Sequence, residues 1–120
     1  MTDTGFTVKH DTDFERSGRW ILARRSLELR SFGMNLVEIE PGGSIPEHDE
    51  TGRMQEEVFI VLEGTAAAVI EGVAHPAPAG TYVRLDPEPR RTITNVGDDP
   101  VRVLIVSAPV ASGYEPMEWA

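Results

Sequence analysis

The sequence predicts an all-β fold, a sandwich or barrel built from short strands. Eleven glycines and nine prolines separate short apolar runs, and no long helical pattern interrupts them. The 120 residues suffice for one compact domain, and a hydrophobic content of 40 % can supply its core. We therefore expect a single domain over residues 1–120, with an arm at 1–17, a core at about 33–107 and a tail at 108–120.

The first elements are expected in this order. The polar residues 1–17 form a surface arm or an edge strand. A strand is expected around Trp20 to Arg24, although "ILARRSLELR" also has some helical periodicity. A clearer strand, "GMNLVEIE", is ended by the turn "PGG" at Pro41 to Gly43.

The clearest strand pattern is "EVFIVLEG", residues 57–64. Its apolar side chains from Val58 to Leu62 alternate onto both faces, which predicts a strand covered on both sides, inside a sandwich or at a subunit interface. "TAAAVIEGVAHPAPAG" follows as a hairpin that turns at Glu71 and Gly72. Further strands are expected in "TYVRLDPEP", "RRTITN" and "VRVLIVSAP", and Trp119 is expected to anchor the tail by packing.

Composition excludes several classes of function. A net charge of -9 argues against nucleic acid and against an anionic membrane surface as partners. The chain has no cysteine, so disulfides and thiolate chemistry are excluded. The first residues lack the apolar segment of a secretory signal, and no apolar run approaches a membrane span, so a cytoplasmic location is expected.

The stretch "PEHDETGRMQEEVFIVLEG" places one histidine among carboxylates ahead of the clearest strand. His48 and Glu50 are two residues apart, so on an extended segment both point to the same face. Glu57 opens the apolar strand, and a buried carboxylate there would be costly without a partner. If Arg91 opens "RRTITN", its side chain shares a face with Ile93 and Asn95. We therefore expect His48, Glu50, Glu57 and Arg91 to line one mouth of the barrel.

These residues resemble the first motif of the cupin superfamily, a family of small jelly-roll β-barrels. The motif has a glycine, five residues, His-x-His, a short gap, a glutamate, six residues and a glycine. Here the turn at Pro41 to Gly43, His48, Glu57 and Gly64 match it, and Glu50 holds the place of the second histidine. Six residues separate Glu50 from Glu57, more than usual, so the loop carries a small insertion around residues 51–53.

The second cupin motif is more eroded. Gly80 fits its opening glycine and Asn95 its closing asparagine. Asp86 and Glu88 stand where a proline and a glycine are expected, and Arg91 stands at the histidine. The resemblance covers about residues 33–107 and implies a cupin-type double-stranded β-helix, with degraded metal motifs.

The resemblance implies a metal ion bound inside the barrel, with His48, Glu50 and Glu57 as its possible ligands here. One imidazole and two carboxylates suit Zn, Mn or Fe(II). Arg91 cannot be a ligand, because its guanidinium is always charged and has no lone pair to donate. Alternatively, Arg91 replaces the cation by forking onto Glu50 or Glu57. The arginine at the fourth ligand position favours a metal-free or weakened site.

Three functions stay open at this point. The first is a cupin that binds a small polar or anionic molecule through His48, Glu50, Glu57 and Arg91. The second is a metal-dependent dioxygenase, isomerase or decarboxylase that uses His48, Glu50 and Glu57. The third is a metal-free isomerase or epimerase in which His48 and Glu57 are the catalytic acid–base pair. Whether the chain is an enzyme is left undecided. The doubly apolar strands at 58–62 and 103–106 also favour a homodimer.

Overall fold

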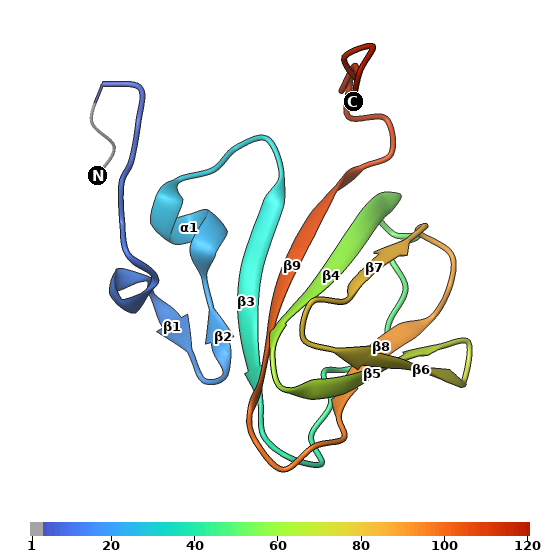
Figure 1. Ribbon diagram of the computed structural model, residues 1–120. Helices are drawn as coiled ribbons and strands as arrows, with labels where there is room; N and C mark the ends of the chain where they lie inside the picture. The colour runs from blue at the N-terminus through green and yellow to red at the C-terminus, as the bar shows by residue number, and fades with distance from the viewer. Residues whose placement is uncertain (1–3) are drawn as a thin grey trace.

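The computed structural model describes residues 4–120 and consists of two antiparallel sheets (Figure 1). The larger sheet has six strands in the order β1-β2-β3-β9-β4-β7. Its strands are β1 (Arg16–Ser17), β2 (Trp20–Ile21), β3 (Gly33–Ile39), β9 (Val101–Pro109), β4 (Gln55–Glu63) and β7 (Tyr82–Leu85). The smaller sheet has the order β6-β5-β8, with β6 (Val73–Pro78), β5 (Thr65–Ile70) and β8 (Arg91–Asn95). The predicted all-β class is confirmed.

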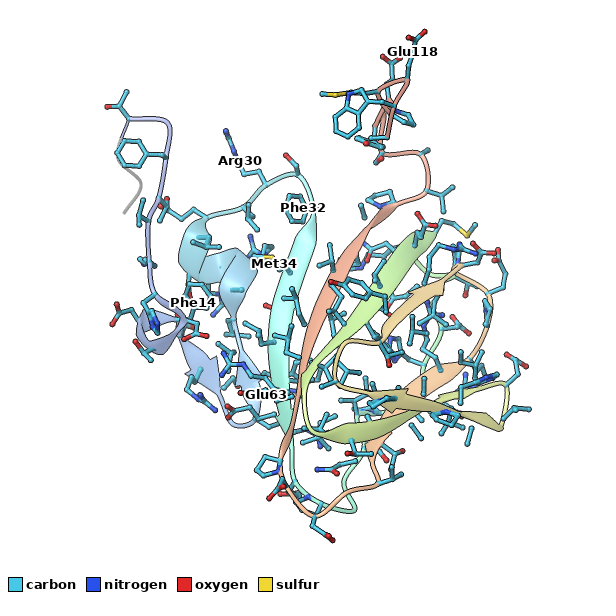
Figure 2. All side chains as sticks on the ribbon, viewed as in Figure 1. Phe14, Arg30, Phe32, Met34, Glu63 and Glu118 are labelled. Carbon is cyan, nitrogen blue, oxygen red and sulfur yellow. The ribbon has the colours of Figure 1, made fainter. Side chains whose placement is uncertain are left out.

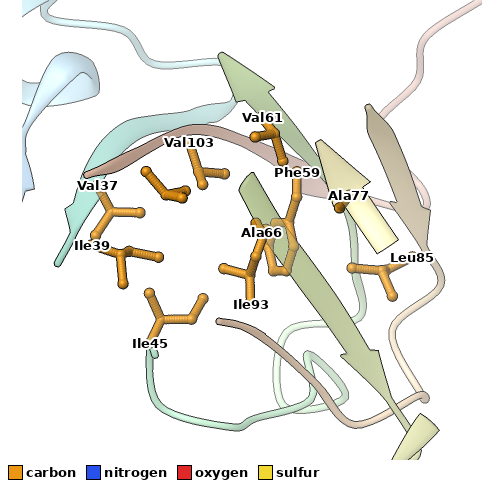
Figure 3. Packing of buried hydrophobic residues seen from close by; sticks show 11 residues of the cluster. Val37, Ile39, Ile45, Phe59, Val61, Ala66, Ala77, Leu85, Ile93 and Val103 are labelled. Carbon is orange, nitrogen blue, oxygen red and sulfur yellow. The ribbon is translucent and has the colours of Figure 1, made fainter. Parts of the chain in front are cut away.

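The main core fills the space between the two sheets (Figure 3). Buried side chains from both sheets, and from the segment between β3 and β4, contribute to it: Val37, Ile39, Ile45, Phe59, Val61, Ala66, Ala77, Leu85, Ile93, Val101 and Val103. Because side chains alternate along a strand, β3, β4 and β9 each give alternate residues to this core. The buried residues of β8 are Arg91, Ile93 and Asn95, so the predicted shared face of that strand is confirmed.

β4 buries one of its faces completely and leaves the other partly open. Phe59 and Val61 are fully buried, whereas Val58 and Ile60 are half-buried and Leu62 is 43 % exposed. Within the single chain the strand is therefore covered on one side, and the expected cover of its other side at a subunit interface stays a prediction. The second sheet lies over the inner face alone.

The corner between β4 and β5 requires a glycine. Gly64 has φ +87°, and a Cβ on it would lie 2.7 Å from the carbonyl oxygen of Pro100. The chain then continues into the predicted hairpin, whose turn residues Glu71 and Gly72 have φ 49° and 77°. Positive φ at both positions fits a turn of the hairpin type that follows the twist of the strands. The hairpin prediction is confirmed.

The N-terminal segment covers the outer face of β3 and β9. The 3-10 helix η1 (Asp11–Asp13) and the α-helix α1 (Ala23–Leu27) flank β1 and β2. Ile21, Ala23 and Leu36 form a second buried cluster, against which Phe14, Met34 and Leu104 pack (Figure 2 labels Phe14 and Met34).

The strand expected around Trp20 to Arg24 ends at Ile21, because the chain turns into α1. That turn buries Ala23 completely. The helix stops after one turn, where Glu28 takes the left-handed conformation with φ 60°. The helical periodicity in this stretch therefore describes a real but short helix.

The C-terminal tail extends away from the barrel (Figures 1 and 2). Tyr114 is 75 % exposed and Trp119 is 83 % exposed. The expectation that Trp119 anchors the tail is wrong for the single chain, because its ring finds no core surface to cover. None of the helices in residues 4–120 has the length and apolar character of a membrane span.

Candidate functional site

His48 is placed by a bridge between the loop before β4 and the start of β8. Its backbone N–H donates to the carbonyl of Arg91 at 3.0 Å, and its own carbonyl accepts from the N–H of Arg91 at 2.8 Å. The ring atom Nδ1 lies 3.0 Å from the carbonyl oxygen of Pro46. Because a carbonyl can only accept, Nδ1 carries the hydrogen of this contact. In the neutral ring, Nε2 is then the nitrogen with the free lone pair.

That free nitrogen faces two carboxylates. The distance from Nε2 is 3.2 Å to Oε2 of Glu50 and 3.5 Å to Oε1 of Glu57. One ligand atom from each of the three residues lies within 4.8 Å of the others. A lone pair that faces two anionic oxygens calls for a positive charge between them, either a proton on the ring or a metal ion. The structure thus brings together the three residues that the sequence proposed as metal ligands.

Glu57 is the deeply buried member of the group. Its side chain is 7 % exposed, against 22 % for Glu50 and 33 % for His48. Burial raises the pKa of the Glu57 carboxyl above its ordinary value, and the charge of Glu50 acts in the same direction. His48 and Arg91 oppose the rise in this pKa without cancelling it. A cation at the site would relieve the desolvation cost that burial imposes on the charged carboxylate.

Arg91 lies behind Glu57, and its side chain is fully buried. Its Nε donates to Oε1 of Glu57 at 3.2 Å. Its terminal nitrogens donate to three backbone carbonyls of the β7–β8 loop, those of Asp86, Pro87 and Pro89. The two-pronged fork onto a carboxylate that the sequence suggested is therefore absent among the described contacts. Arg91 contacts one oxygen of Glu57 and organises the loop beneath the site.

A cavity of about 220 Å³ opens in front of the three residues. Its apolar wall includes Trp20, Met34, Ile45 and Ile105, and Asn35 and Ser107 add polar atoms. These side chains come from β2, β3, β9 and the loop before β4. Arg91 is not among the residues that line this cavity.

Sequence reasoning did not identify Trp20, Asn35 or Ser107 as neighbours of the site. Asn35 lies on β3 and pairs with Ile105 on β9, and both continue the strand face that carries the core pair Val37 and Val103. The pairing of β3 with β9 spans most of the chain, so no local pattern reveals it. His10 and His75 are exposed, and neither belongs to the group of His48, Glu50 and Glu57.

The donor set fits a divalent metal ion of the kind that the cupin resemblance implies. It offers an imidazole nitrogen of fixed tautomer and two carboxylates, one of them costly to keep charged without a partner. Such a set suits Zn, Mn or Fe(II) and leaves coordination positions for other molecules. When bound, the ion would supply Lewis-acid polarisation of an oxygen atom on a neighbouring molecule.

Comparisons with known proteins agree with this architecture. The solved structure of a cupin protein from Bacteroides fragilis matches with a TM-score of 0.80 and 20 % identity, over 98 % of this chain and 94 % of that one. A Cupin 2 conserved barrel domain protein from Salinispora arenicola matches with a TM-score of 0.60 and 29 % identity, over 69 % of this chain and 67 % of that one. A predicted oxalate decarboxylase from Thermotoga maritima matches with a TM-score of 0.70 and 18 % identity, over 87 % and 100 % of the two chains.

The first and third of these structures are less than 25 % identical to the chain, so they show a shared fold and nothing about activity. No curated protein matches the sequence. The model of the cupin domain family matches residues 35–107, more than half of the chain. That match, together with the two-sheet barrel and the first-motif residues gathered at its mouth, shows that the chain belongs to the cupin family.

Proposed function

We propose that this cupin binds one divalent metal ion through His48, Glu50 and Glu57 and holds a small polar or anionic molecule beside it. One observation carries the proposal. Nε2 of His48, left with its lone pair by the contact of Nδ1 with Pro46, faces carboxylate oxygens at 3.2 and 3.5 Å. A cation satisfies all three donors at once.

The arginine at the fourth ligand position favoured a metal-free or weakened site in the sequence. The position of the Arg91 side chain supports a metal-binding site instead. Arg91 directs its donors at the β7–β8 loop and at Oε1 of Glu57, the oxygen that also faces His48, and it does not line the cavity in front of the site. Because a neighbouring cation lowers the affinity for a second one, we still expect weaker binding than a four-ligand site would give.

Metal titration tests the proposal. Protein purified without an affinity tag is stripped with a chelator and titrated with Mn²⁺, Zn²⁺ or Fe²⁺ by calorimetry. We expect one ion per chain, and we expect His48→Ala to weaken binding by at least about 100-fold, since a lost ligand costs more than a lost supporting contact. His75→Ala, at an exposed position on β6, is the matched control and should bind as the wild type does. Sub-stoichiometric metal that is indifferent to His48→Ala would contradict the proposal.

A metal-free acid–base function is the second candidate. It rests on the distance of 3.5 Å between His48 Nε2 and Glu57 Oε1, together with the raised pKa of the Glu57 carboxyl. A proton shared by this pair could move to and from a molecule in the cavity. Turnover of an isomerisable substrate that persists in chelator and is lost in His48→Ala would favour this candidate over the metal site.

A further inference from the structure

The arginines of the chain divide into two groups. Six of the ten form ion pairs: Arg16, Arg25, Arg84, Arg90, Arg91 and Arg102. Within residues 4–120, no ion pair involves Arg19, Arg24, Arg30 or Arg53.

Three of these four arginines line one cavity. A cavity of about 730 Å³ is lined by Arg24, Arg30 and Arg53. Ser31, Asn35 and Gln55 add polar groups to its wall. We call it the arginine cavity. Figure 2 shows Arg30 on the connection between α1 and β3, close to Phe32 and pointing away from the sheet.

The arginine cavity adjoins the proposed metal site. It shares Gly33, Asn35, Glu50 and Ser107 with the smaller cavity in front of His48 and Glu57. Glu50 therefore stands at the border, and its carboxylate is directed at His48. Because the two cavities share these lining residues, one molecule can contact both.

The three arginines come from separate parts of the chain, two ahead of the residues that the family model matches and one in the lengthened loop of the first motif. Arg24 lies on α1 and Arg30 follows it, both before the matched residues 35–107. Arg53 lies in the insertion of the first motif. The insertion is ordered by its own hydrogen bonds, since Thr51 donates to Asp49 through both its N–H and its hydroxyl. Arg24 is held by a bond of 3.2 Å to the carbonyl of Leu29. The segment around α1 and the lengthened loop thus both contribute arginines to the lining of this cavity.

Guanidinium groups bind carboxylate and phosphate oxygens in two-pronged pairs. Three such groups and one carboxylate, that of Glu50, line the arginine cavity, so the formal charge of its lining is positive and favours an anion. Glu50 and Glu57 would repel an anion that reached them, unless a cation neutralised them. The two features are therefore complementary: arginines for the charged end of a molecule and a metal for its other end.

We propose that the arginine cavity binds the carboxylate or phosphate group of a small organic anion whose other end lies at His48, Glu50 and Glu57. The contact of the anionic group rests on the arginines, and the contact of the other end rests on the proposed metal site. It assigns a substrate or ligand class to the protein: an organic acid or a phosphate ester that also carries a metal-binding oxygen, such as a hydroxyl.

Binding of two probes tests the inference. Malate and glycerol 3-phosphate are titrated by calorimetry into Mn²⁺-loaded protein, with glycerol as the neutral comparison. We expect at least one anion to bind and glycerol not to bind, and the two anions distinguish a carboxylate from a phosphate site. Each of Arg24→Gln, Arg30→Gln and Arg53→Gln should weaken anion binding by about tenfold or more, since bonds to charged groups are strong. Arg19 also has no ion pair within the described residues, but it lies outside this cavity. Arg19→Gln should therefore leave anion binding unchanged.

The triple variant separates the two proposals. It should bind Mn²⁺ as the wild type does and lose the anion. If neither anion binds to Mn²⁺-loaded protein, or if the triple variant binds anions unchanged, the arginine cavity is not the anion site. If Mn²⁺ does not bind, the metal proposal fails by itself. The anions are then titrated into the metal-free protein, where loss of their binding in the triple variant supports the arginine contact and unchanged binding overturns it.

Discussion

At the scale of single residues, Arg91 has a different task from the one its motif position suggests. Its side chain is fully buried, and it donates to Glu57 and to the carbonyls of Asp86, Pro87 and Pro89. Buried carbonyls without donors are costly, and so is a buried carboxylate without a cation. Arg91 satisfies both, so it supports the site from behind and stabilises the β7–β8 loop.

Arg91→Met should therefore destabilise the protein strongly. We expect a loss of about 3 to 5 kcal/mol in the free energy of unfolding, because one partner of a buried pair is left alone. The neighbouring Arg90→Met is the control. Arg90 is 52 % exposed and pairs with Glu47 at the surface, so its loss should cost less than about 1 kcal/mol. Urea denaturation measures both variants, and equal losses would contradict the supporting role of Arg91.

Glu57 should give the metal-free protein a recognisable pH dependence. Its pKa is raised above 4.5 in the folded state, so the folded protein holds a proton there that the unfolded chain has released. The stability that this proton contributes is complete below the unfolded pKa and is lost as the pH rises through the raised one. Glu57→Gln mimics the protonated form and does not titrate.

The difference between the unfolding free energies of Glu57→Gln and the wild type should accordingly grow with pH from about 4.5 upward and then level off. Denaturant titrations in the presence of a chelator, repeated at several pH values, measure this difference. Glu56→Gln is the matched control, since Glu56 is exposed and pairs with Arg84. A difference that is constant with pH, or that shrinks, would show that burial does not raise the pKa of the Glu57 carboxyl.

At the scale of elements, local pattern predicted the strands whose faces differ most in burial. β4, β8 and the β5–β6 hairpin were expected where they lie, because apolar alternation and glycine turns are properties of adjacent residues. The short helix α1 depends on Ala23 meeting the outer face of β3, a contact that no window of sequence contains. The strand that local propensity suggested, around Trp20 to Arg24, ends at Ile21, where the chain turns to bury Ala23.

The residues in and around the candidate site also divide into those that the sequence reveals and those that it does not. His48, Glu50 and Glu57 could be found from spacing, because they belong to one loop and the strand that follows it. Arg24 and Arg30, which line the neighbouring arginine cavity, could not, since α1 and the segment after it place them there. Arg53 gave a partial signal, because it lies in the insertion that departs from the cupin motif. A charged residue in an insertion beside a motif can therefore indicate a residue that lies near the site.

At the scale of the whole molecule, the described residues leave the outer face of β4 and β7 open to solvent. The N-terminal segment covers the outer face of β3 and β9 but does not reach β7. Val58 and Ile60 on β4 are half-buried, and their neighbour Tyr82 on β7 is 70 % exposed. The tail after β9 also presents Tyr114 and Trp119 to solvent. A second copy could cover this face and the tails at once, in a symmetric arrangement that repeats each contact.

We predict a homodimer that uses the outer face of β4 and β7. Tyr82→Glu should raise the dimer dissociation constant by at least about tenfold, because it places a charge in a desolvated aromatic contact. Val73→Glu is the control, since Val73 is 57 % exposed on β6 in the other sheet. Each chain carries a net charge of -9, so added salt should strengthen association by screening the repulsion between copies. Light scattering over a concentration series measures all three effects. A monomeric wild type at every salt concentration would refute the dimer, and a dimer indifferent to Tyr82→Glu would move the interface away from this face.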